Sequence, residues 1–199
     1  MTRELEPLEV LILNAGLAQE RGNSQVLCEF VQQELRGKGV ACAVANVASI
    51  GPAQIAAARA LVFVTGTYWS SWSSVLQAFL ERMTETEGTS VWLGKPVVVL
   101  VSAHQVGAFS VLCRLQGVLC ALGCSVPPMT GVVITRVGER VRLNHPDEAT
   151  DVWGLPDVRI ALHNLLEAVR GSRDFRAWNS DREHFEAVWL QADPETGSG

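Results

Sequence analysis

Short apolar runs alternate with segments of helical periodicity along most of the chain. In the periodic segments, apolar side chains recur three or four positions apart, as on the buried face of a helix. We predict strands at Leu8 to Leu13, Val40 to Val44, Ala60 to Val64, Val97 to Val101 and Val126 to Ile134. Predicted helices lie at Ser24 to Leu35, Ala53 to Arg59 and Val75 to Met83, in a segment ending at Leu122, and in a segment beginning near Pro156.

The predicted strands at Ala60 to Val64 and Val97 to Val101 are apolar on both faces. Such strands must be covered on both sides, and strands separated by helices are joined by crossovers, which makes the sheet parallel. We therefore predict a flavodoxin-like three-layer α/β/α sandwich, with a five-stranded parallel sheet in the order 2-1-3-4-5. This single domain is expected to span residues 1–171. Residues 172–199 are expected to form a tail that is partly disordered or packs on a partner subunit.

The composition of the chain argues against two classes of function, nucleic-acid binding and membrane insertion. The chain has 199 residues, 48% of them hydrophobic, which suffices for one core, and a formal net charge of −5. That charge argues against a nucleic-acid binder, because such a protein needs a basic face to displace counterions. The apolar runs are far shorter than a bilayer span, and Leu8 to Leu13 is too short for a signal-peptide core. We expect a cytoplasmic protein with neither nucleic-acid nor membrane partners.

The five cysteines are odd in number and lack paired C-x-x-C spacing. They therefore predict neither a disulfide framework nor a metal site. Cys113, Cys120 and Cys124 recur at helical spacings of seven and four, so we expect them to be small buried residues on one helix face.

Candidate chemistry lies in the loops that follow strands one, three and four. In a doubly wound sheet, ligands bind beyond the carboxyl ends of the strands, at the point where the strand order reverses. The first of these loops contains Gly16, Gly22, Asn23 and Ser24 just before a helix. Free amides and the helix dipole there favour an anion such as a phosphate. The alternative is that Asn23 and Ser24 only cap the helix.

The second loop concentrates aromatic and hydroxyl side chains, Thr67, Tyr68, Trp69, Ser70 and Ser71. Such residues can pack against a planar ring and hydrogen-bond to its heteroatoms. Alternatively, this is a surface loop whose Trp69 or Trp72 fills a subunit interface, which is compatible with the first interpretation.

The third loop contains Ser102, His104 and Gly107, and its small residues could offer backbone donors to the other side of a ring. A lone histidine in a loop is more often a spectator than a catalyst, so proton transfer by His104 is not favoured.

Together these segments resemble the NAD(P)H-dependent FMN reductase family from about Val10 to Ile134. Gly22 to Leu27 resembles the family's "G-N-T-x-x-L" helix start, and Gly66 to Ser71 with Leu76 to Arg82 resembles its "P-x-Y" and "L-K-x-F-x-D-R" signature. The resemblance implies FMN, with its phosphate on the first loop and its ring against the other two. Residues assigned to the cofactor are Gly16, Arg21, Gly22, Asn23, Ser24, Thr67, Tyr68, Trp69, Ser70, Ser71, Ser102, His104 and Gly107.

The family resemblance also implies a reaction. NAD(P)H would deliver hydride to the flavin, and the electrons would pass to a quinone, a flavin, an azo or nitro compound, or a metal ion. The flavin carries this chemistry, so no catalytic side chain is required.

The chain departs from the family at the phosphate loop. The family's phosphate-binding Ser and Arg fall on Leu17 and Gln19, and Arg21 is a candidate substitute. Losing two hydrogen bonds of roughly 1–3 kcal/mol each would weaken FMN by two orders of magnitude or more. The alternative function is therefore a non-catalytic binding or regulatory protein on the same scaffold, with weakened or lost FMN binding.

Tryptophan content bears on assembly. The chain has six tryptophans, more than a small core usually needs, and protein interfaces favour this residue. We predict a homodimer or homotetramer with the site near the subunit boundary.

Overall fold

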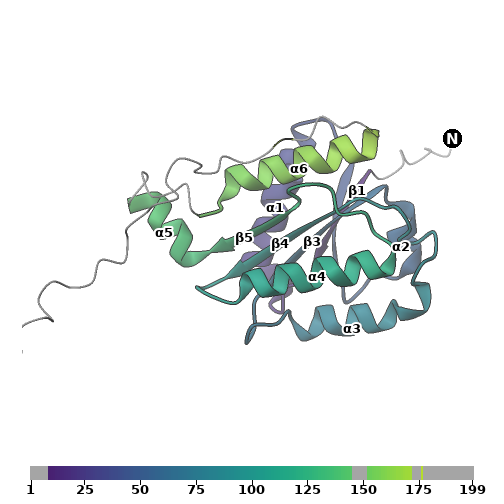
Figure 1. The fold of residues 1–199 in the computed structure, drawn as a ribbon, viewed down its shortest axis with the longest axis horizontal. Helices are drawn as coiled ribbons and strands as arrows, with labels where there is room; N and C mark the ends of the chain where they lie inside the picture. The colour runs from purple at the N-terminus through teal and green to yellow at the C-terminus, as the bar shows by residue number, and fades with distance from the viewer. Residues whose placement is uncertain (1–8, 145–151, 172–175, 177–199) are drawn as a thin grey trace, which may run out of the picture.

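The computed structural model describes residues 9–144, 152–171 and 176, which are built around a parallel sheet (Figure 1). Its strands are β1 (Val10–Asn14), β2 (Cys42–Asn46), β3 (Ala60–Gly66), β4 (Val97–Ala103) and β5 (Gly131–Thr135). The spatial order is β2-β1-β3-β4-β5, and every neighbouring pair is parallel. The predicted flavodoxin-like fold is confirmed.

Helices cover both faces of the sheet (Figure 1). They are α1 (Asn23–Arg36), α2 (Pro52–Ala57), α3 (Ser74–Arg82), α4 (Ala108–Leu122), α5 (Arg136–Asn144) and α6 (Leu155–Arg170), with short 3₁₀ turns η1 (Gln19–Arg21) and η2 (Thr84–Thr86). Apolar side chains of α1 and α6 form one core against the sheet, and those of α2, α3 and α4 form the other. In the described part of the chain, no helix is both long enough and apolar enough to cross a membrane.

Two elements differ from the sequence prediction. The segment from Arg136 contains a helix, α5, that the sequence did not predict. Only Gly138 is buried in this helix, so its sequence has no apolar periodicity. The fifth strand begins at Gly131 rather than Val126. Proline has no N–H to give to a strand ladder, and Pro127 and Pro128 stand in this segment, which turns back instead: the Thr130 hydroxyl donates to the Pro127 carbonyl at 2.7 Å.

Three aromatic residues anchor α3 to the sheet. The Phe63 and Phe79 ring centroids lie 6.1 Å apart, and those of Phe79 and Trp92 lie 6.3 Å apart. All three side chains are fully buried, and the Trp92 indole N–H donates to the Thr86 hydroxyl at 2.7 Å. Burying each ring contributes about 1.5–3 kcal/mol relative to exposure, and this packing fixes where the loop before α3 stands.

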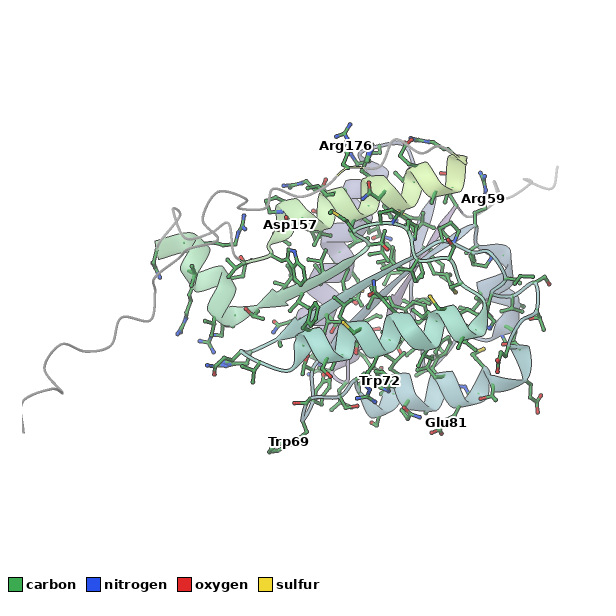
Figure 2. The ribbon with its side chains drawn as sticks, viewed as in Figure 1. Arg59, Trp69, Trp72, Glu81, Asp157 and Arg176 are labelled. Carbon is green, nitrogen blue, oxygen red and sulfur yellow. The ribbon has the colours of Figure 1, made fainter. Side chains whose placement is uncertain are left out.

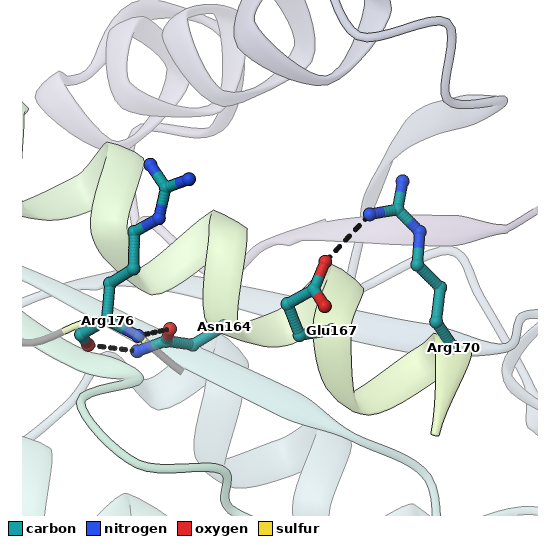
Figure 3. A network of polar contacts seen from close by, with 4 residues as sticks. All are labelled: Asn164, Glu167, Arg170 and Arg176. Carbon is teal, nitrogen blue, oxygen red and sulfur yellow. Dashed lines mark hydrogen bonds and ion pairs between the residues drawn. The ribbon is translucent and has the colours of Figure 1, made fainter. Parts of the chain in front are cut away.

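Asn164 in α6 binds the backbone of Arg176, a residue beyond the end of α6 (Figure 3). Its amide nitrogen donates to the Arg176 carbonyl at 2.8 Å, and its carbonyl oxygen accepts from the Arg176 N–H at 2.7 Å. The same nitrogen donates to the Pro128 carbonyl at 2.8 Å. One turn further along α6, Glu167 and Arg170 form an ion pair at 2.8 Å. Of the predicted tail, residues 172–199, only Arg176 lies within the described residues.

The expectation that three cysteines share a buried helix face is wrong. Cys113 and Cys120 are exposed on α4, because the buried face of that helix is taken by larger residues such as Leu115 and Leu119. Cys124 is buried but lies beyond the end of α4, and burial raises the pKa of its thiol to about 12.

Candidate functional site

The loops after β1, β3 and β4 enclose a hollow of about 190 Å³ at the carboxyl edge of the sheet. This is the edge where the sheet order predicts a ligand, on either side of the reversal between β1 and β3. The residues that line the hollow are Gly16, Ala18, Gly22, Asn23, Ser24, Gly66, Thr67, Tyr68, Ser102, Ala103 and His104.

The side chain of Asn14, buried at the end of β1, shapes the first loop. Its carbonyl oxygen accepts from the Gly16 N–H at 3.0 Å, and its amide nitrogen donates to the Gln19 carbonyl at 3.0 Å. The same nitrogen donates to the side-chain oxygen of Gln25 at 2.9 Å. Gln19 has a positive φ of 49°, which lets the chain turn back toward α1. The loop is therefore held from its centre by one amide.

The N-terminus of α1 presents free backbone donors to the hollow. The residue that precedes the helix is Gly22, which is extended and forms no side-chain cap, so the expectation that Asn23 or Ser24 caps the helix is wrong. Among the described residues, the N–H groups of Gly22, Asn23 and Ser24 donate to no protein acceptor. Unpaired first-turn amides at the positive end of a helix form a site for an anion.

A tight turn locks the second loop. Tyr68 and Ser71 exchange backbone hydrogen bonds of 2.7 and 2.9 Å, and the residues between them, Trp69 and Ser70, have φ angles of 50° and 59°. Two positive φ values in succession are the geometry of a type I′ turn. The Tyr68 hydroxyl accepts from the Leu17 N–H at 3.2 Å, which joins this turn to the first loop. Trp69, at the tip, points away from the body of the protein (Figure 2).

The third loop packs against the tip of the second. Gly107 precedes α4 with a φ of 87°, and a Cβ there would lie 2.9 Å from the Ser70 Oγ. Glycine is therefore required twice, for the left-handed backbone and for the close approach. His104 is exposed, and its Nε2 lies 3.5 Å from a guanidinium nitrogen of Arg136.

Thr67, which lines the hollow, has an unpaired hydroxyl. Its Oγ1 is buried and forms no hydrogen bond with any of the described residues. Leaving a buried hydroxyl unpaired costs about 1–3 kcal/mol, so a ligand atom that pairs with it gains that much in return. Thr67 and the first turn of α1, with its free amides, line the same hollow, which fits a phosphorylated ligand with a polar body.

The structure brings together many, but not all, of the residues predicted for the site. Gly16, Gly22, Asn23, Ser24, Thr67, Tyr68, Ser102 and His104 line the hollow, whereas Arg21, Trp69, Ser70, Ser71 and Gly107 do not. Ala18, Gly66 and Ala103 were missed, since small side chains carry no chemical signal. The one indirect sign of a role for Gly66 in the sequence was its place at the end of a buried strand. In the structure, a Cβ at this position would lie 3.1 Å from the Tyr68 ring.

The helix that gave the most specific sequence match has a structural role. Trp72 donates its indole N–H to the Gln77 side chain at 2.8 Å, and Gln77 donates to the Glu81 carboxylate at 2.8 Å. Arg82 donates to the Val47 carbonyl at 2.8 Å, which ties α3 to the segment after β2. Figure 2 labels Trp72 and Glu81, both on the α3 side of the molecule. Gln77 and Glu81, which depart from the signature, are thus matched to each other.

A family model supports the resemblance that the sequence predicted. Residues 52–138 match the model of NADPH-dependent FMN reductases. The match covers the second and third loops and α3, and it begins after the first loop with its departures at Leu17 and Gln19. No curated protein sequence matches the chain.

Several solved structures share the fold. RosB with the bound intermediate 8-demethyl-8-formylriboflavin-5'-phosphate is 18% identical, with a TM-score of 0.65 over 96% of this chain and 98% of that one. A flavodoxin from the domain Archaea is 14% identical, with a TM-score of 0.61 over 81% and 99%. An oxidoreductase from Corynebacterium diphtheriae is 15% identical, with a TM-score of 0.55 over 82% and 94%. At such identities the likeness establishes the flavodoxin-like fold alone.

A substitution at Gly16 tests how tightly the first loop is built. A Cβ at Gly16 would lie 2.7 Å from the Ser24 side chain, whereas one at Gly117, in α4, would meet nothing within 4 Å. We predict that Gly16→Ala lowers the free energy of unfolding by about 1–3 kcal/mol through overpacking. The matched Gly117→Ala raises it by about 0.5–1 kcal/mol because helical glycine is entropically costly. Urea unfolding measures both, and a Gly16→Ala protein as stable as wild type would contradict the geometry.

Proposed function

We propose that this flavodoxin-like protein, which resembles the NADPH-dependent FMN reductases, is a flavin-dependent oxidoreductase. It takes hydride from NAD(P)H and passes electrons to a small acceptor such as a quinone, a flavin, an azo or nitro compound, or a metal ion. The observation that carries the proposal is the hollow itself. Free amides suited to a phosphate and the unpaired hydroxyl of Thr67 meet there, at the sheet edge where this fold binds ligands.

The first turn of α1 would hold the phosphate. The N–H groups of Gly22, Asn23 and Ser24 supply donors, and the positive end of the helix dipole favours the anion. Each hydrogen bond to a charged group contributes about 1.5–3 kcal/mol. Backbone donors of this kind do not depend on the side chains at Leu17 and Gln19, and they support retention of the flavin despite those departures.

The second and third loops would orient the ring. Thr67 offers its hydroxyl, and Tyr68 is held by the Leu17 N–H so that its ring borders the hollow. When bound, the flavin supplies the capacity to accept and return hydride, and the protein supplies position and exclusion of water. RosB, which shares the fold, was solved with a bound riboflavin-5'-phosphate derivative, and this supports a flavin as the ligand.

A second candidate is a non-catalytic binding or regulatory protein on this scaffold. The observation that favours it is the side-chain chemistry of the first loop: Leu17 is half-exposed, and among the described residues that line the hollow none is an arginine or a lysine. A phosphate there would be held without a permanent cationic side chain, which lowers its affinity relative to a loop that has one.

The first experiment is to purify the protein, record its visible spectrum, and titrate it with FMN. We expect saturable FMN binding, and FMN-dependent oxidation of NADH or NADPH with a quinone acceptor. Binding without turnover over a panel of acceptors would favour the regulatory candidate. A colourless protein that binds no FMN would refute the oxidoreductase and favour the regulatory candidate with lost FMN binding.

A Thr67→Val substitution tests whether the unpaired hydroxyl serves a ligand. In the free protein it removes an unsatisfied buried group, so we expect the free energy of unfolding to stay level or rise by about 1 kcal/mol. FMN binding should weaken about 5-fold or more, because the ligand would no longer recover the roughly 1–3 kcal/mol that the unpaired hydroxyl costs. The control is Thr130→Val, whose hydroxyl is already paired with the Pro127 carbonyl; it should lose stability and keep its FMN affinity. Unchanged FMN affinity in Thr67→Val would exclude the hydroxyl from the site.

Exposed apolar side chains near the hollow support the proposal of a homo-oligomer with its contact beside the site. Trp69 is 102% exposed, Val106 75%, Phe109 60% and Leu17 51%, and the first three lie on the second loop, on the third loop and at the start of α4. Clustered exposed apolar groups mark interaction sites more often than scattered ones do.

We expect light scattering to give a dimeric or tetrameric mass at micromolar concentration. The Trp69→Ser variant should have a mass closer to that of the monomer, whereas Leu93→Ser, at the opposite end of the sheet, should keep the wild-type mass. A monomeric wild type would refute the contact.

A further inference from the structure

A second and larger cavity opens directly from the hollow. It is a groove of about 710 Å³, within the range of about 300–1,000 Å³ that is common for small-molecule sites. One side is the face of α1 that carries Val26 and Phe30, and the other side is formed by the end of β5, α5 and the start of α6. Asn23, Ser102 and Ala103 line both cavities. A ligand seated at the start of α1 can therefore extend from the hollow into the groove.

The floor of the groove is apolar and suits the flat face of a base. Val26, Leu27, Phe30, Ile134 and Leu155 contribute to it, from three separate elements. Val26 is 65% exposed although it is apolar and sits in the middle of the α1 face. An apolar floor beside a phosphate-sized site is the arrangement that a nucleotide needs, with the base on the floor and the phosphate at the mouth.

Three charged side chains line the groove, Arg136 and Glu139 from α5 and Glu29 from α1. The Glu139 Oε1 is buried and has no hydrogen-bond partner among the described residues. A carboxylate oxygen accepts hydrogen bonds, so it suits a donor such as a ribose hydroxyl or an exocyclic amino group. Arg136 lines the groove and lies 3.5 Å from His104, which lines the hollow, so a guanidinium stands between the two cavities. Guanidinium groups pair well with phosphate oxygens.

The groove adjoins the phosphate end of the hollow. Among the described residues, none from the second loop lines the groove, whereas Gly66, Thr67 and Tyr68 line the hollow. Asn23, in the first turn of α1, lines both cavities, so a second phosphate joined to one at the start of α1 would enter the groove there.

We propose that the groove binds the adenosine monophosphate half of FAD, so that the dinucleotide is the preferred flavin of this protein. This inference rests on the proposed function, because it presupposes a flavin phosphate at the start of α1. The second phosphate lies toward Arg136, the adenosine lies on the apolar floor, and Glu139 accepts from its donor groups.

Equilibrium dialysis of the flavin-free full-length protein against FAD and FMN, read by flavin absorbance, tests the proposal without any assay of turnover. We expect FAD to bind at least 10-fold more tightly than FMN. Val26→Trp fills the groove from an exposed position, and it should abolish that preference while FMN affinity stays within 2-fold. Glu139→Gln keeps the shape and removes the charge, and it should weaken FAD about 3-fold or more with FMN unchanged.

Leu93→Trp is the matched control, since Leu93 is 67% exposed and lies before β4, at the opposite end of the sheet from the groove. It should leave both affinities unchanged, and circular dichroism confirms that each variant is folded. Equal binding of FAD and FMN, or an FAD preference that survives Val26→Trp, would overturn the proposal and leave the flavin function standing. Failure of the wild type to bind either flavin would overturn both.

Discussion

The buried carbonyl of Ala15, one residue past the end of β1, is the point on which the site depends. The Ser73 hydroxyl donates to it at 2.6 Å and the Thr65 hydroxyl donates at 3.3 Å, while the Ala15 N–H donates to the Val64 carbonyl at 2.8 Å. Ser73 also accepts from the Leu76 N–H at 3.1 Å and so caps α3. A single residue, Ala15, thus joins the first loop, strand β3 and the helix after the second loop. Because a buried polar group left unpaired costs about 1–3 kcal/mol, these bonds keep the loops in register.

Because these side chains bond to the protein itself, backbone groups rather than side chains would contact the ligand. Asn14 uses its own amide to shape the first loop, and Gly22 contributes no side chain before α1, so the helix amides face open space. Side-chain changes at Leu17 and Gln19 alter the charge near an anion but not the supply of donors. A phosphate site of this construction can tolerate sequence drift that a site built from an arginine would not, because the helix dipole persists as long as the helix does.

The sheet order was predictable because its strands are short apolar runs separated by helices, and parallel pairing leaves few alternatives. The location of the site followed from the reversal of strand order. Which individual residues line the hollow was harder to predict. Trp69 was expected at the ring, but positive φ angles at Trp69 and Ser70 turn it outward. No pattern of side chains in the sequence indicates these angles. Helix α5 was missed because its sequence has no buried stripe. Glu139, whose unpaired oxygen matters for the groove, lies in that same unpredicted helix.

Helix α5 explains why the groove exists. A direct connection from β5 to α6 would bring α6 along α1 at the carboxyl edge, and apolar packing would close the space. Instead α5 lies there, and Gly138 is its one fully buried residue, at which a Cβ would lie 2.8 Å from the Thr135 hydroxyl oxygen. A helix that buries so little contributes little to the core. Its charged groups Arg136 and Glu139 instead line the groove beside the proposed phosphate site.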